Sequence, residues 1–141
     1  MPKIETADLK HIIYSSRPLG FERKTVEQIL TSSQKNNPRV GVTGLLIYGA
    51  DLYLQLLEGP VKDLEETFNR IKSDTRHDKI RILKESVIDQ RLFASWTMRP
   101  QNLKVMMWEE EDIKNGLVQN LSPNQSFNVF KNLSREFDQF N

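Results

Sequence analysis

One polar side chain, Gln55, lies inside an otherwise apolar run, Leu52-Tyr53-Leu54-Gln55-Leu56-Leu57, of this 141-residue chain. In a strand, alternation would place Gln55 on the same face as Tyr53 and Leu57. An amide buried without hydrogen-bond partners costs roughly 1–3 kcal/mol, so we expect Gln55 to have partners. Most buried polar side chains bond to backbone or water, and a structural amide is therefore the simplest interpretation of Gln55 alone.

Tyr14 and the pair Asn36-Asn37 add polar groups of the kind that binding sites use. Tyr14 lies in an apolar strand pattern with Ile12 on its face, where an isolated tyrosine usually keeps its hydroxyl at the rim of the core. The two asparagines follow a helical pattern, where asparagine often forms a C-terminal cap. Each residue again has a simple structural explanation.

Arg76-His77 and the pair Trp96 and Met98 complete the set. Arg76 and His77 follow a second helical pattern, where the helix dipole favours positive charge. Trp96 and Met98 fall in the last expected strand and fit a core. It is the set as a whole, and no single member, that favours a functional site.

The composition excludes several kinds of chemistry. The chain has no cysteine, which excludes disulfides, thiol catalysis and cysteine-ligated metals. With two histidines we expect no metal site, and no P-loop, GxGxxG or His-Glu-x-x-His motif occurs. A net charge of +1 gives no indication of a nucleic-acid or membrane partner. The sequence shows neither a signal peptide nor an apolar run near the ~20 residues that span a bilayer, so we expect a cytoplasmic protein.

These residues are positioned by alternating strand and helix patterns. Helical periodicity predicts helices that follow Thr25 and Gly59-Pro60, and Glu58 is interpreted as a cap of the second one. The resulting order, β-α-β-β-α-β-β, is a ferredoxin-like α+β pattern with both helices on one face of the sheet. The expected strands are residues 9–15, 42–48, 52–58, 80–87 and 93–98.

The C-terminal part of the chain is predicted to form two further helices. The first is the polar segment 109–120, and Ser122-Pro123 opens the second, with serine as the cap and proline at the first helical position. We expect these helices to cover the sheet face that the first two leave bare. Residues 1–100 would then form one domain and residues 101–141 a helical extension. One stripe on the last helix comprises Phe127, Phe130, Leu133, Phe137 and Phe140, which fits packing on the sheet or self-association.

Five segments occur in an order that is specific when they are taken together. They closely resemble the BLUF family of flavin-binding blue-light sensors, from about residue 9 to residue 99. Two departures are mild: Val42 stands where the family usually has isoleucine, and Tyr53 where it usually has phenylalanine. The segments are Ile13-Tyr14-Ser15-Ser16, Asn36-Asn37-Pro-x-x-Gly41-Val42-Thr43-Gly44-Leu45-Leu46-x-Tyr48, Leu54-Gln55-Leu56-Leu57-Glu58-Gly59, Asp74-x-Arg76-His77 and Arg91-x-Phe93-x-x-Trp96-x-Met98.

The resemblance implies a bound flavin, FAD in preference to FMN, and a photochemical role for two residues. Tyr14 would donate an electron and a proton, and Gln55 would bridge its hydroxyl to the N5/O4 edge of the flavin. The glutamine amide would turn over or tautomerise, which moves the flavin absorption slightly to the red. Trp96 and Met98 would compete for the position beside Gln55 and relay the change. The residues implied to hold the flavin are Ile29, Asn36, Asn37, Gln55, Arg70, Ile71, Arg76 and His77, with Ser33 as a weaker candidate.

The length, with two helices after the domain, looks like the short stand-alone proteins of that family. The ~40 residues beyond the match are too few for an effector domain, so we expect a signalling protein and not an enzyme. The fifth strand leads to the C-terminal helices, which would report the light state to an unknown protein partner or through a homo-oligomer, either a dimer or a larger ring.

Three other functions remain open at this point. An RNA-binding module can use the same sheet, with Tyr14 and Tyr53 as stacking aromatics, although its basic and aromatic strand motif is absent. A flavin-dependent redox enzyme would need an acid–base pair beside Gln55, and none is evident. A structural oligomerisation domain would account for the phenylalanine stripe and leave Gln55 and Asn37 unexplained.

Overall fold

The computed structural model describes residues 8–18, 41–49, 52–73, 77–93, 96–97, 111–112 and 115–140, with only the backbone at 18, 48–49, 77–78, 96–97 and 136–140. Five strands form one sheet in the order β4-β1-β3-β2-β5. The first four are antiparallel to their neighbours, and β5 runs parallel to β2. The strands are β1 (Leu9–Pro18), β2 (Thr43–Gly49), β3 (Leu52–Pro60), β4 (His77–Ile88) and β5 (Trp96–Thr97).

This arrangement confirms the ferredoxin-like α+β fold, with β1 and β3 at the centre of the sheet. Every residue of β3 from Leu52 to Gly59 is buried, because both faces of the strand are covered. Phe93, expected in the fifth strand, lies before β5, and Met98 lies outside the described residues. The first expected helix, after Thr25, also lies outside them.

Helix α2 (Val61–Lys72) follows β3 directly. Leu64, Phe68 and Ile71 repeat at helical spacing and face the sheet, where the first two are buried. The expectation that Glu58 caps this helix is wrong. Pro60 occupies the N-cap position and no side chain caps the helix. Glu58 has other partners, because its side chain points to the opposite face of the sheet from α2.

Helix α5 (Pro123–Phe140) begins as the sequence predicts. The Ser122 Oγ accepts a hydrogen bond from the Gln125 backbone N–H at 3.1 Å, and the Gln125 Oε1 accepts one from the Ser122 N–H at 2.8 Å. This reciprocal pair is a capping box, which satisfies two backbone donors at the helix start. Before α5, residues 115–117 form a turn at Gly116 (φ 92°) and η3 (Val118–Asn120) is a short 3-10 helix, so the described end of segment 109–120 is not a regular α-helix.

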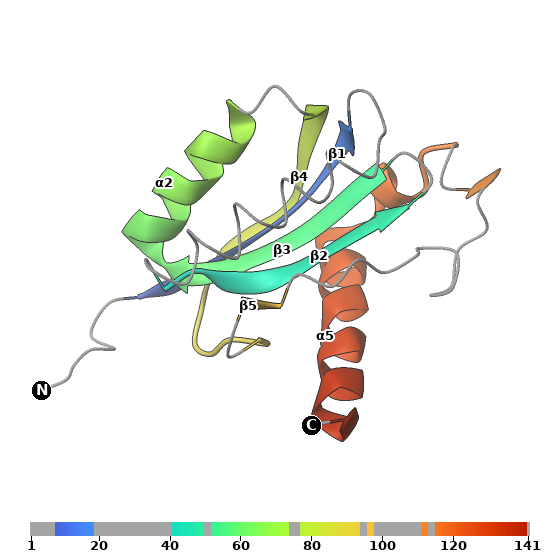
Figure 1. Ribbon diagram of the computed structural model, residues 1–141. Coiled ribbons are helices and arrows are strands. Elements are labelled where there is room, and N and C mark those ends of the chain that lie inside the picture. Colours follow the sequence, from blue (N-terminus) through green and yellow to red (C-terminus); the bar gives the residue numbers. More distant parts are fainter. Residues whose placement is uncertain are drawn as a thin grey trace, which may run out of the picture.

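The two helices lie on opposite faces of the sheet, as Figure 1 shows, and each face has its own core. The expectation that a C-terminal helix covers the second face is confirmed, because Phe130 and Leu133 of α5 are buried against strand residues. The α2 core comprises Ile12, Tyr14, Val42, Leu57, Leu64 and Phe68. The α5 core comprises Ile13, Leu45, Ile47, Leu52, Leu54, Leu56, Leu83, Phe93, Val118, Val129, Phe130 and Leu133.

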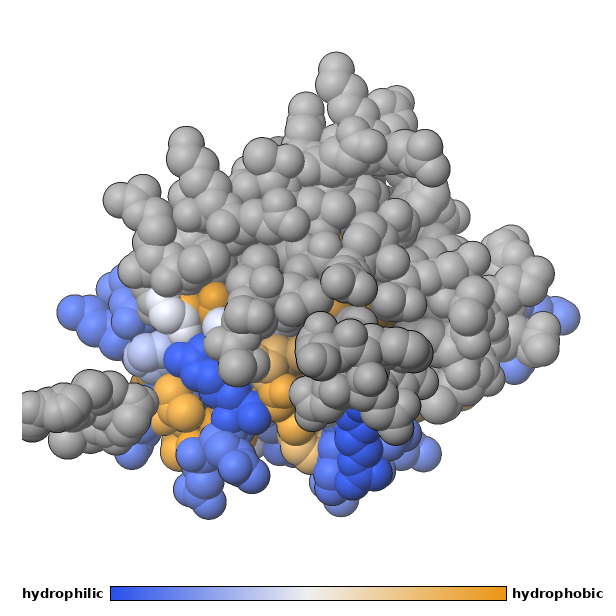
Figure 2. Space-filling view, turned by 60° about the horizontal axis from the view of Figure 1, so that its bottom comes forward, coloured by the Kyte–Doolittle hydropathy of each residue, from blue (hydrophilic) through white to orange (hydrophobic). Residues whose placement is uncertain are grey.

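On the face that Figure 2 shows, apolar residues lie between hydrophilic ones. Large hydrophobic side chains that are exposed among the described residues are Ile82, Val87 and Leu117. None of the helices in the described part of the chain combines the length and the apolar character needed to cross a bilayer.

Gly44 is required by the close approach of β2 to β3. A Cβ on Gly44 would lie 2.0 Å from the Leu56 carbonyl oxygen, and its φ of 152° is unfavourable for other residues. We expect Gly44→Ala to lower the free energy of unfolding by roughly 2–4 kcal/mol, measured by urea denaturation.

Gly116→Ala is the matched control, because a Cβ there would meet only the Asn120 Nδ2, at 3.3 Å. It should cost about 1 kcal/mol through its positive φ alone. Equal losses in the two variants would contradict the steric argument.

Candidate functional site

Tyr14 and Gln55 form the central polar pair of the α2 face. They are directly opposite each other in the β1–β3 ladder. The Tyr14 hydroxyl donates a hydrogen bond to the Gln55 Oε1, and the two residues are 3% and 4% exposed. The expectation that Gln55 must have a partner is therefore confirmed. One partner is another side chain, that of Tyr14, whereas the simplest interpretation suggested backbone or water.

The wall around this pair is apolar. Leu57 and Val42 flank it on the sheet, while Leu64 and Phe68 approach from α2. The Phe68 ring lies 5.3 Å from the Tyr14 ring, centroid to centroid, and is tilted by 55°. A hydrogen-bonded phenol and amide in such surroundings are held in fixed positions, because moving either one would leave a buried polar group unsatisfied.

The remaining predicted site residues divide into two groups. Ile71 is half-buried beside the α2 core, and Arg70 is exposed, with its guanidinium donating to the Thr67 Oγ1 at 3.3 Å. His77 and Trp96 are described by their backbone alone, in β4 and β5. The residues that lie outside the described part of the chain are Ile29, Ser33, Asn36, Asn37, Arg76 and Met98.

Glu58, which was interpreted from the sequence as a helix cap, lies three residues after Gln55 on β3. It is 1% exposed and accepts the backbone N–H groups of Leu92 and Phe93 at 2.8 and 2.9 Å. Arg91 donates to the Thr43 Oγ1 at 2.7 Å and to the Glu58 carbonyl oxygen at 3.3 Å. The sequence signal that could have indicated a buried role for Glu58 was its position directly after the apolar residues Leu56 and Leu57.

On the opposite side of β1, His11 forms a second polar cluster. Its Nε2 lies 2.8 Å from the Lys84 Nζ and 2.9 Å from the Ser86 Oγ. Its ring contacts that of Phe127 in α5, with centroids 5.6 Å apart, and the Lys84 Nζ lies 5.3 Å from the same Phe127 ring centroid. Burial, and then the positive charge of Lys84, lower the pKa of His11 to about 4. This cluster therefore connects the sheet to α5.

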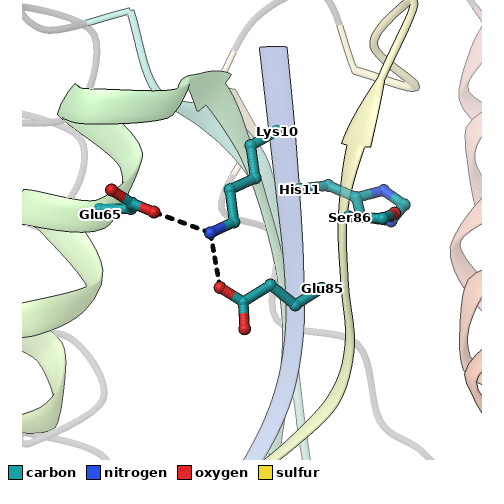
Figure 3. Close-up of polar contacts among 5 residues, drawn as sticks. All are labelled: Lys10, His11, Glu65, Glu85 and Ser86. Atoms are coloured by element: carbon teal, nitrogen blue, oxygen red, sulfur yellow. Dashed lines mark hydrogen bonds and ion pairs between the residues drawn. The ribbon is translucent and has the colours of Figure 1, made fainter. Parts of the chain in front are cut away.

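Lys10 and His11 are consecutive in β1 and point to opposite faces, as Figure 3 shows. The Lys10 Nζ lies between two carboxylates, 2.9 Å from Glu65 of α2 and 2.6 Å from Glu85 of β4. The hydrogen bonds to Glu85 and Glu65 raise the pKa of the Lys10 ammonium. These ion pairs attach α2 to the sheet on the side where Tyr14 and Gln55 lie.

Residues 9–99 match the sequence profile of the BLUF family, described as sensors of blue light using FAD. The chain belongs to the BLUF family. The β subunit of a photoactivated adenylate cyclase from Euglena longa is 24% identical over 102 residues, which are 70% of this chain and 12% of that protein. The chain thus spans about an eighth of the length of this curated relative.

Solved structures agree with the BLUF assignment. The dark-state structure of BlrB, a BLUF protein, has a TM-score of 0.78 and 27% identity, with 92% of this chain and 98% of that chain covered. A bacterial light-regulated adenylyl cyclase has a TM-score of 0.65 and 30% identity, over 88% of this chain and 36% of that chain. Both the chain and its fold are thus those of a BLUF sensor.

The residues of the α2 face fit the flavin that BLUF proteins use. An isoalloxazine ring is apolar on its faces and polar along one edge, so it requires an apolar wall with a few fixed polar groups. The α2 core supplies the wall, and the Tyr14–Gln55 pair supplies the polar group within it. No cluster of three or more potential metal-ligating side chains occurs in the described ranges.

The low pKa of His11 makes stability depend on pH. In the unfolded chain His11 binds a proton near pH 6.5, whereas in the folded protein it does so only near pH 4. As the pH falls through 6.5 the unfolded state gains a proton that the native state does not, so stability falls. We expect this group to remove about 2 kcal/mol from the free energy of unfolding between pH 7.5 and pH 5, measured by urea denaturation.

His11→Leu should reduce this pH dependence by that amount, because it removes the group whose pKa is lowered in the folded protein. A His11→Leu protein with the full pH dependence of the wild type would show that the buried histidine is not its source.

Proposed function

We propose that Tyr14 and Gln55 are the photochemical pair of this blue-light sensor. The observation that supports the proposal is the hydrogen bond from the Tyr14 hydroxyl to the Gln55 Oε1, buried in an apolar wall on the α2 face. FAD bound on this face would supply the absorption of blue light and an electron-accepting ring.

The chemistry of the amide explains how this pair can hold two states. Tyr14 donates to the Oε1 of Gln55, so the two hydrogens of the Nε2 are directed to other acceptors. A half-turn of the amide exchanges Oε1 and Nε2, which reverses the donor and the acceptor that Gln55 presents without moving β3. The Tyr14 hydroxyl would release its proton toward the Oε1 as its ring gives up an electron to the flavin. It would recover both while the amide is in its new arrangement, so that the flavin is oxidised again and only the hydrogen bonds differ from those in the dark.

Other residues would hold and enclose the cofactor. Ile71 of α2 lies beside the apolar wall and would pack on the ring. Arg70, near the end of α2, is positioned to reach a phosphate of the cofactor tail because its side chain extends into solvent. By their resemblance to the family motif, we assign Ile29, Asn36, Asn37, Arg76 and His77 to the same site, with Ser33 as a weaker candidate.

We propose that residues 1–100 form the sensor and residues 101–141 its output extension. The sheet face behind the Tyr14–Gln55 pair is covered by α5, so a change in the sheet reaches this helix directly. The output would be a changed surface for a protein partner or for a second copy of this chain. Relatives whose names are those of adenylate cyclases carry the same sensor in much longer proteins.

The proposal is tested by the light response of the flavin-loaded protein. Tyr14→Phe removes the hydroxyl that donates to Gln55, so we expect it to bind flavin and to lose the slight red shift of the absorption bands after a blue flash. Tyr53→Phe is the matched control, because Tyr53 is buried two residues from Gln55 on the same strand and is opposite Ser16, not Tyr14, in the β1–β3 ladder. That variant should retain the shift.

The opposite pattern would contradict the proposal. If Tyr14→Phe shifts as the wild type does, the tyrosine is not the donor. If the wild-type flavin bleaches under blue light and does not shift, the site performs net redox chemistry.

A further inference from the structure

Glu58 occupies an unusual position for a carboxylate. It lies three residues after Gln55 on β3 and points to the opposite face, where it is 1% exposed. Its two oxygens accept separate backbone N–H groups, the Oε2 from Leu92 and the Oε1 from Phe93. A buried carboxylate is costly unless it is fully hydrogen-bonded, so this arrangement fixes the backbone at residues 92–93 more firmly than apolar contact alone.

Arg91 strengthens the same attachment. Its guanidinium bonds the Thr43 side chain and the Glu58 carbonyl oxygen, which joins residues 91–93 to both β2 and β3. Thr43 directly precedes Gly44, the residue that pairs with Trp96 at the start of β5. Burial raises the pKa of the Glu58 carboxyl, while the two backbone N–H groups and Arg91 oppose that rise.

The attachment lies just before β5. Among the described residues, β5 pairs with β2 at Gly44–Trp96 and Leu45–Thr97, and Phe93 is the last described residue before it. The bonds from Glu58 therefore fix the chain three residues before Trp96, where β5 begins.

We propose that Glu58 is a positioning residue that fixes the start of β5 and so sets how Trp96 responds to Gln55. The inference rests on the proposed function of Tyr14 and Gln55. Gln55 and Glu58 belong to the same strand, β3. The residues before β5 are therefore bonded to the strand that also carries the proposed light-sensitive amide. Leu92 and Phe93 also pack in the core beneath α5, so the residues that Glu58 holds belong to the same core as the proposed output helix.

The test compares Glu58→Ala, Glu58→Gln and the control Glu66→Ala, an exposed glutamate of α2, in the flavin-loaded protein. A Trp108→Phe background leaves Trp96 as the sole tryptophan, because the chain has two. Three quantities are measured: exchange of the Leu92 and Phe93 amide hydrogens in the dark, the light-minus-dark difference in Trp96 fluorescence, and the flavin red shift.

In Glu58→Ala we expect the two amides to exchange about tenfold faster or more, because each loses an acceptor. The Trp96 difference should disappear while the flavin shift remains, since Tyr14 and Gln55 are untouched. Glu58→Gln should give intermediate values, because its amide offers one acceptor for two N–H donors. Glu66→Ala should match the wild type in all three measurements.

Faster amide exchange with an unchanged Trp96 difference would show that Glu58 is only structural and would overturn the proposal, as would wild-type exchange in Glu58→Ala. If Glu58→Ala does not fold, Glu58→Gln decides in the same way: a reduced Trp96 difference supports the proposal and a wild-type difference overturns it. A wild type without any flavin shift would instead refute the function of the Tyr14–Gln55 pair, which the amide exchange measurement does not depend on.

Discussion

The register between β1 and β3 is the constraint on which the rest of this structure depends. In the observed register Tyr14 is opposite Gln55, and the two meet on the α2 face. A slip of one residue would turn every side chain of one strand to the other face, which would separate the phenol from the amide and place both among apolar residues without partners. The burial of Leu54 and Leu56 on one face and of Leu57 on the other makes any other register costly, so the Tyr14–Gln55 pair is fixed by the packing of apolar residues around it.

The two faces of the sheet contact different helices, and consecutive residues of one strand point to opposite faces. Lys10 joins β1 to α2, while His11 contacts α5 through Phe127. In the same way, Gln55 faces the α2 core and Glu58 faces the core beneath α5. A strand that is buried on both sides and paired on both edges is stiff, so we expect a changed hydrogen bond on one face to alter the contacts on the other. Such coupling would let the proposed signal cross the sheet without a large rearrangement of the fold.

Local sequence signals predicted most of the fold. Ser122 was predicted as the cap of α5 because a serine directly before a proline is typical of a helix start, and the composition of β1 to β4 predicted strands close to those observed. Glu58 was assigned wrongly because its real partners, Leu92 and Phe93, lie 34 and 35 residues away, and only the folded sheet brings them together. For the same reason the bond between Tyr14 and Gln55, 41 residues apart, came from the family resemblance and not from the spacing of the residues.

The attachment before β5 and the turn at Gly116 show a second limit. Residues 91–93 are bonded to β2 and β3 by partners more than 30 residues away in the sequence. The helical pattern of residues 109–120 did not reveal that Gly116 adopts a positive φ, which ends regular helix there. Both features depend on contacts or backbone geometry that neighbouring sequence does not specify.

The most direct test of the central claim is the visible absorption spectrum of the purified protein before and after a blue flash. The account predicts an oxidised flavin spectrum that moves slightly to the red and returns in darkness, because only the hydrogen bonds at the flavin edge change. A protein that takes up no added flavin, or one whose flavin does not respond to light, would contradict it.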